Sequence, residues 1–216
     1  MDIDEKKIIN KVIPIIISAL INDGLISDES TEKEVKEAVQ AYIDSDNIDS
    51  WDMVITASDV LMETLEYAVD NNQYDASVTL TGIIVEQMIN EFYNDVLIDK
   101  HNFSKTEYDS CMKVIPTKDK LTWLYRITTS ESIDSETVSR IDNIRKARND
   151  VVHYKPKREN INATIKWQNI PVDIDELLPL IDKLKRYFQE CIYTIFPENK
   201  MAEELFEKFF SNCDRD

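Results

Sequence analysis

Three residues in the second half of the chain carry groups that suit phosphate chemistry: Arg148, Asn149 and His153. A guanidinium presents a fork of donors that can hold a phosphate and stabilise developing negative charge. The unperturbed pKa of an imidazole lies near neutral pH, so His153 can serve as general base or general acid. Asn149 can orient a substrate or the imidazole ring. Because RNA carries its own nucleophile, the ribose 2′-hydroxyl, such a set would suffice to cleave RNA without a metal.

A helix that begins near Val138 must position these groups. At about 100° per residue, Arg148 falls near the centre of the apolar side of this helix. A guanidinium there is costly unless it is paired or faces something other than a dry core. We expect Tyr154-Lys155-Pro156 to end the helix. The apolar side is formed by Val138, Ile141, Ile144, Val151 and Val152.

His153 points in another direction from the arginine in a regular helix. Asn149 and His153 lie four residues apart, so they share a face with Arg145 beside the apolar side. His153 is rotated by about 140° from Arg148. The two can act together only if the last turn of the helix opens or if a second chain supplies the missing partner.

The sequence Arg148-Asn149, three residues and then His153 resembles the R-x(4–6)-H motif of HEPN domains. In that family the motif closes a long helix of a small all-helical bundle, and two protomers pair so that their motifs meet in one cleft. The resemblance covers roughly residues 50–196, and the predicted order of helices matches the family's bundle. It implies an all-α, HEPN-like bundle of four to five core helices with an N-terminal helical extension.

Many HEPN domains are metal-independent ribonucleases, and the resemblance implies the same roles here. Arg148, His153 and Asn149 would be catalytic, no metal or cofactor would be needed, and RNA would be cut to a cyclic 2′,3′-phosphate and a 5′-hydroxyl. Family members often carry an acidic residue on the helix that corresponds to residues 75–98. Glu86 occupies such a position, and two interpretations are open: it holds Arg148, or it is solvated. Substrate-binding roles fall to Arg145, Lys146, Tyr154 and Lys155.

Two functions remain open. The first is an endoribonuclease of the toxin or antiphage-defence kind, which acts as a homodimer on an RNA substrate and is silenced by a protein partner or by its folding state. The second is a non-catalytic HEPN-like module for dimerisation or for RNA or protein binding. In that case Arg148 pairs with a carboxylate and His153 only hydrogen-bonds at the helix end. A plain helical adaptor would leave Arg148 unexplained.

Composition narrows the fold and the chemistry. The chain has 216 residues, is 43% apolar, and contains two glycines, Gly24 and Gly82. This excludes phosphate-binding loops of the P-loop or dinucleotide type and disfavours a turn-rich β fold. The three cysteines, Cys111, Cys191 and Cys213, have no C-x-x-C spacing, which favours ordinary thiols over a zinc site or a disulfide framework.

The net charge of −17 argues against general binding to nucleic acid. Between residues 140 and 166, however, the chain has eight basic and three acidic residues. This basic island surrounds the motif. It would suit an anion held at one site. The alternative is that basic residues collect near a helix C-terminus to offset its dipole.

The helical pattern divides the chain into three predicted parts: an N-terminal helical extension (1–49), the HEPN-like bundle (50–197) and a C-terminal helix (198–216) that packs on the bundle or on a dimer partner. In the extension we expect a helix over 4–23 that ends at Gly24 and a second one that opens with a capping box at Thr31. Gly82 lies inside the longest predicted helix, which indicates the close approach of a neighbouring helix. Residues 157–169 lack a helical period and follow the motif directly, so they could form one wall of the site.

Location is predicted from the N-terminus and from the apolar runs. The chain opens with Met1-Asp2-Ile3-Asp4-Glu5, which is acidic where a signal peptide is basic. The apolar run over residues 13–21 is too short to cross a bilayer. We therefore expect a cytoplasmic protein with no membrane partner.

Overall fold

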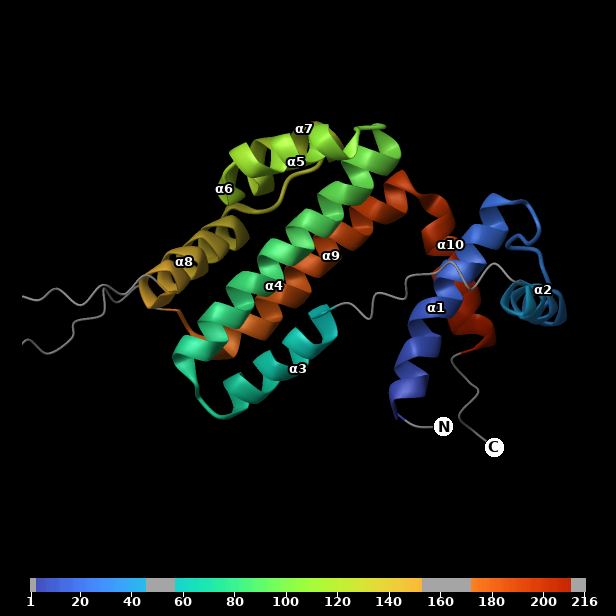
Figure 1. The fold of residues 1–216 in the computed structure, drawn as a ribbon, viewed down its shortest axis with the longest axis horizontal. Helices are drawn as coiled ribbons and strands as arrows, with labels where there is room; N and C mark the ends of the chain where they lie inside the picture. The colour runs from blue at the N-terminus through green and yellow to red at the C-terminus, as the bar shows by residue number, and fades with distance from the viewer. Residues whose placement is uncertain (1–2, 46–56, 153–171, 211–216) are drawn as a thin grey trace, which may run out of the picture. The chain divides into compact units, whose positions relative to one another are not determined.

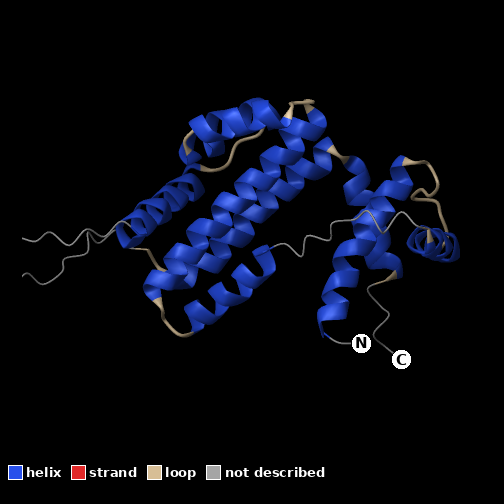
Figure 2. Ribbon diagram, viewed as in Figure 1, coloured by secondary structure: helices blue, strands red, loops and turns tan. Residues whose placement is uncertain are grey.

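The computed structural model describes residues 3–45, 57–152 and 172–210 (Figure 1). Every regular element in these ranges is a helix, and the ranges contain no strand (Figure 2). The all-α class predicted from the sequence is therefore confirmed. The chain divides into two compact units, residues 1–55 with 192–216 and residues 56–191, and each unit is described by itself.

The first unit joins the beginning of the chain to its end. Helix α1 (Ile3–Asn22) packs along α10 (Pro197–Phe209), and α2 (Glu32–Asp44) lies against α1. The Ser18 hydroxyl donates a hydrogen bond to the Asn199 side-chain oxygen over 2.8 Å. The buried side chains come from all three helices: Ile16, Ile17, Leu20, Val35, Val39, Ala202, Leu205 and Phe206, together with Ile26 from the connection between α1 and α2.

Local signals in the first unit act as predicted. The Thr31 hydroxyl accepts from the Glu34 backbone N–H, and the Glu34 carboxylate accepts from the Thr31 N–H, which completes the capping box of α2. After α1, Gly24 adopts a left-handed φ of 69°. The Leu25 N–H then donates to the Leu20 carbonyl, and this bond satisfies the exposed end of α1. Helix α1 continues through Pro14.

The second unit contains the predicted motif helix. Helices α3, α4, α8 and α9 are its long elements, and shorter helical pieces join α4 to α8 (Figure 1). The elements are α3 (Ala57–Asp70), α4 (Tyr74–Asn94), the π-helical turn η2 (Asp95–Lys100), α5 (Lys105–Val114), α6 (Thr117–Asp119), a second π-helical turn η3 (Lys120–Leu124), α7 (Tyr125–Thr129), α8 (Ser135–Val152), the 3-10 turn η4 (Ile174–Glu176) and α9 (Leu177–Ile195), of which the residues up to Cys191 belong to this unit.

An aromatic cluster holds α4, α7 and α9 together. The Phe92 ring stacks on Phe188 with 4.4 Å between centroids, and Tyr125 lies 5.6 Å from Phe92. The Tyr125 hydroxyl contacts Cys191 Sγ over 2.7 Å. Burial raises the pKa of the Cys191 thiol, so this cysteine is a neutral, packed side chain. Cys213 lies outside the described residues.

The structure differs from the sequence prediction at α5 and at Val152. Helix α5 was not among the elements predicted from the sequence. Its signal is a capping box: Ser104 accepts from the Glu107 N–H, and Glu107 accepts from the Ser104 N–H. Val152, placed on the apolar side of the motif helix by periodicity, is 56% exposed.

Asp134 connects the start of α8 to α9. Its carboxylate accepts from the Thr137 N–H over 2.9 Å, which identifies Asp134 as the cap of the motif helix. It also accepts from the Tyr187 hydroxyl and pairs with Lys183 Nζ over 2.8 Å. The hydrogen bond from Lys183, followed by those from Thr137, holds the pKa of Asp134 well below its usual range.

We expect Asp134→Ala to lower the free energy of unfolding by about 1–2 kcal/mol at pH 7, because it removes the cap and the links to α9. Since the folded-state pKa of Asp134 is depressed, this contribution is present above the unfolded-state pKa and is lost as pH falls below about 4. Urea unfolding at a series of pH values measures the effect. Glu131→Ala, which removes an exposed carboxylate nearby, is the control. A difference between the two variants that persists unchanged at pH 3 would contradict this role.

Candidate functional site

Arg148 occupies the place on α8 that the sequence predicted. Val138, Ile141, Ile144 and Ala147 are buried, and α8 packs on α4 along this side. Arg148 continues the same side toward the C-terminal end of α8, and its side chain is 24% exposed. The arginine therefore lies at the edge of the helix interface, with its aliphatic part covered.

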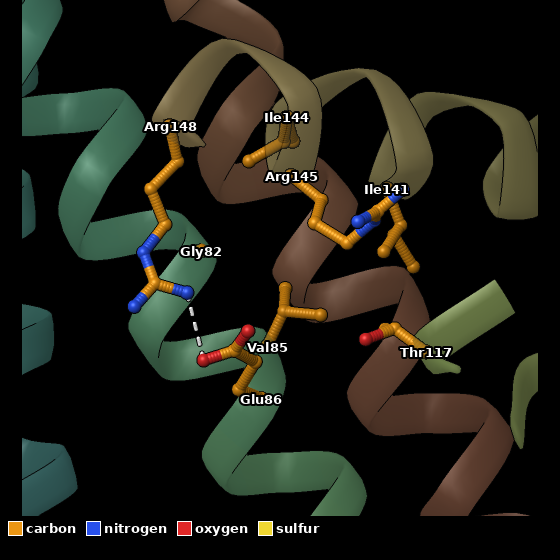
Figure 3. Close-up of a pocket in the computed structure, with 8 residues that line it drawn as sticks. All are labelled: Gly82, Val85, Glu86, Thr117, Ile141, Ile144, Arg145 and Arg148. Atoms are coloured by element: carbon orange, nitrogen blue, oxygen red, sulfur yellow. Dashed lines mark ion pairs between the residues drawn. The ribbon is translucent and has the colours of Figure 1, made fainter. Parts of the chain in front are cut away.

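Gly82 makes room for Arg148. A Cβ atom added at Gly82 would lie 2.7 Å from Arg148 Cδ, which is closer than carbon atoms pack. Figure 3 shows the Arg148 side chain crossing α4 at Gly82. The close helix approach predicted at this glycine is therefore confirmed, and the approaching group is the stem of the arginine.

Glu86 lies one helical turn beyond Gly82 on α4 and receives the guanidinium. Arg148 Nη1 is 2.7 Å from Glu86 Oε2, so the ion pair is present and Glu86 is not merely solvated (Figure 3). The Glu86 side chain is 44% exposed. The pair thus sits at the surface, where its net contribution to stability is at most about 1 kcal/mol.

A small hollow surrounds this pair. Its wall is formed by α4 and α8, and Thr117 closes it on the side of α6 (Figure 3). Arg145 also lines it, and its guanidinium is bound to Asp142 with Nη2 3.0 Å from Oδ1. The lining residues are Gly82, Val85, Glu86, Thr117, Ile141, Ile144, Arg145 and Arg148.

The described part of the basic island is neutralised within the chain. Arg140 pairs with Glu136 and Glu176, and Lys146 pairs with Asp142 over 2.6 Å. The hydrogen bonds from Lys146 and then Arg145 lower the pKa of Asp142 despite its partial burial. Arg145 and Arg148 are paired as well, so each basic residue between 140 and 152 contacts a carboxylate, and Arg145 and Lys146 share the one charge of Asp142.

The structure brings together some of the predicted site residues. Arg148, Glu86 and Arg145 meet at the hollow, whereas Lys146 does not line it and Asn149 is exposed. His153, Tyr154 and Lys155 lie outside the described residues, as does the predicted wall over residues 157–169.

Two residues near the pair were missed by the sequence analysis. Asp142 was counted only as part of the charge balance, yet it holds both Arg145 and Lys146; its spacing of three and four residues from these bases was the available signal. Thr117 reaches the hollow from α6, and no periodicity within its short helix indicates this position.

Together the fold and the hollow define an all-helical protein with an arginine–glutamate pair at a helix–helix edge. Comparison of the chain with protein-family models, with curated proteins and with solved structures gave no match. None of the described helices has both the length and the apolar character needed to cross a membrane. Within the described ranges, no three His, Cys, Asp or Glu side chains gather as metal ligands would.

We expect Gly82→Ala to have opposite effects on stability with and without Arg148. In the wild-type background the new methyl group collides with Arg148 Cδ and displaces the guanidinium from Glu86, so we expect the loss to exceed the gain in helix propensity and the protein to be destabilised. In an Arg148→Ala background the collision is gone, so the same change should stabilise the protein by about 1 kcal/mol.

A double-mutant cycle measured by denaturant unfolding tests this coupling. Glu86→Gln supplies the matched background, because it weakens the ion pair but leaves the arginine stem in place. The penalty of Gly82→Ala should persist there. Equal effects of Gly82→Ala in all three backgrounds would show that Arg148 does not occupy the space beside Gly82.

Proposed function

We propose that this protein is a metal-independent endoribonuclease of the HEPN type, in which Arg148 holds the scissile phosphate. The observation that carries the proposal is the Arg148–Glu86 pair at a surface hollow, on the helix that leads into His153. A guanidinium has five N–H donors, and Glu86 is paired with Nη1. The remaining donors are available to phosphate oxygens while the carboxylate fixes the orientation of the guanidinium.

In the proposed reaction His153 accepts the proton of a ribose 2′-hydroxyl. The 2′-oxygen attacks the adjacent phosphorus, and the bond from phosphorus to the 5′-oxygen of the next nucleotide breaks. The leaving oxygen takes up a proton, which gives a 2′,3′-cyclic phosphate and a 5′-hydroxyl. Arg148 stabilises the charge that develops on the phosphate oxygens. Asn149, exposed on α8, would orient the substrate or the imidazole.

The proposed active form is a homodimer whose two motifs share one cleft. Helix α8 is regular as far as Val152. In a regular helix His153 would be rotated by about 140° from Arg148, so we propose that the arginine and the histidine of one site come from two chains. A cytoplasmic toxin or antiphage role, held in check by a neutralising protein, agrees with the chemistry proposed.

One observation favours a second candidate, a non-catalytic dimerisation or binding module. Arg140, Arg145, Lys146 and Arg148 are each paired with a carboxylate of the same chain, and the chain as a whole carries −17. In that case Arg148 and Glu86 serve to join α8 to α4.

The first prediction of the enzyme hypothesis concerns cellular RNA. Induced expression of the wild type should fragment one or more RNA species into products with cyclic 2′,3′-phosphate ends, detected by sequencing of RNA ends. Arg148→Ala and His153→Ala should each reduce the amount of cleaved RNA by about a hundredfold or more, because one removes a group that stabilises charge and the other a general acid–base group.

Arg140→Ala is the matched control, because it removes a paired arginine from the same helix without touching the hollow. It should cleave like the wild type. Intact RNA in every culture that holds soluble protein would favour the binding module, and reduced stability of Arg148→Ala would then assign that residue a structural role.

The second prediction is the mass of the particle in solution. Gel filtration with light scattering at micromolar concentration should give twice the chain mass of 25.2 kDa, the mass of a homodimer. A monomer under these conditions would rule out a cleft shared between two chains.

A further inference from the structure

A second hollow adjoins the one at Arg148. It is lined by Glu86, Ile89, Asn90, Thr117 and Lys120, so Glu86 and Thr117 belong to both hollows. Both lie within the second unit, where α4 faces α6 and the beginning of η3. A ligand that reaches Arg148 over Glu86 can therefore continue into the space beside Lys120.

Lys120 differs from the basic residues of α8 in having no counter-ion. None of the ion pairs within the described ranges involves its ammonium group, although the residue is only partly exposed. Partial burial lowers the pKa of Lys120, and the nearby charge of Glu86 opposes this effect. A desolvated ammonium without a carboxylate in contact gains more from an anionic ligand than a solvated one does.

Two further polar groups of the second hollow are also without partners. Across the described residues, neither the Thr117 hydroxyl nor the Asn90 side-chain amide takes part in a hydrogen bond. Both can donate to oxygen atoms. The hollow thus presents an ammonium, a hydroxyl and an amide, which are the donors that a phosphate group accepts.

The fold holds the Lys120 backbone in place. The Tyr93 hydroxyl donates a hydrogen bond to the Lys120 carbonyl, and Tyr93 is fully buried on α4. Lys120 also begins the π-helical turn η3, a local departure from α-helical geometry that is frequent at functional sites. The backbone from which the Lys120 side chain extends is thereby held beside α4.

The charged residues that line the two hollows determine whether an anion or a cation can bind there. Arg148 is paired with Glu86, and Arg145 is paired with Asp142, which it shares with Lys146. Lys120 is therefore the cation among the described lining residues that has no carboxylate in contact. Glu86 lies between the hollows, and Arg148 offsets its charge. The Glu86 carboxylate therefore repels an anion less than an unpaired carboxylate would.

We propose that Lys120, Thr117 and Asn90 form a second phosphate subsite, which binds the RNA backbone phosphate next to the one held by Arg148. The subsite rests on the proposed ribonuclease function for its ligand, and its donors fit a phosphate group from either RNA or a free ion. Lys120 supplies the charge, while Thr117 and Asn90 direct hydrogen bonds to the phosphate oxygens. The subsite sets where the RNA strand lies and takes no part in proton transfer.

The test measures binding separately from cleavage, with the full chain and a short 2′-O-methyl oligoribonucleotide of mixed sequence, which has no free nucleophile. Lys120→Met keeps the length of the side chain and removes its charge. It should weaken binding about tenfold and reduce the slope of log K against log salt concentration by about one. Lys113→Met, at an exposed lysine of α5 that lines neither hollow, is the matched control and should bind like the wild type.

Inorganic phosphate, titrated by NMR into the same proteins, separates the two sources of the ligand. Weaker oligonucleotide binding in Lys120→Met alone supports the RNA subsite, and any cleavage activity should then show a raised KM with kcat retained. Equal binding by Lys120→Met and the wild type overturns the subsite even if Arg148 and His153 prove essential for cleavage. Lys120-dependent binding of phosphate without oligonucleotide binding overturns the RNA assignment of the subsite, whereas the ribonuclease proposal is decided by the cleavage assay with Arg148→Ala and His153→Ala. Binding of neither probe to the wild type overturns the subsite.

Discussion

The packing of α8 on α4 has to accommodate a guanidinium that α8 carries at the edge of its packing side. Arg148 would incur a large desolvation cost against an ordinary apolar helix. Helix α4 meets this constraint with two residues four positions apart, which therefore share one face. Gly82 gives space to the aliphatic stem, and Glu86 binds the charged end. Both contacts are made at the same point along α4, and Gly82, Glu86 and Arg148 all line the hollow there.

The same ion pair has two consequences that oppose each other. It orients the guanidinium, which favours recognition of a phosphate, and it lowers the local positive charge, which disfavours attraction of one. The basic residues earlier on α8 show the second effect alone, because Arg140 and Lys146 are held by carboxylates away from the hollow. For the described half of the island, residues 140–152, the excess of basic residues in the sequence is thus a poor measure of surface potential. An uncompensated cation occurs instead at Lys120, outside the island.

Much of the fold was predictable because its signals are local. The capping box at Thr31 and the turn at Gly24 each depend on a few neighbouring residues. Helix α5 escaped prediction because only Tyr108 and Met112 are buried on it, so its apolar period is weak. The packing of α1 on α10 and the place of Lys120 beside Glu86 depend on tertiary contacts between distant segments. Periodicity assigns a residue to one face of a helix, but it does not predict which distant segment packs against that face.

The course of α8 bears on how a site with Arg148 could be completed. Two routes bring His153 to Arg148: the last helical turn opens, or a second chain contributes its own motif. Helical structure persists through Val152, so no opening occurs in the turn that contains Arg148 and Asn149. The exposed side of that turn carries Asn149, Asp150 and Val152, with Val152 the one large apolar side chain of α8 that is mostly in solvent. The second route requires no change in the described part of α8, whereas an opening under the first route would have to lie beyond Val152.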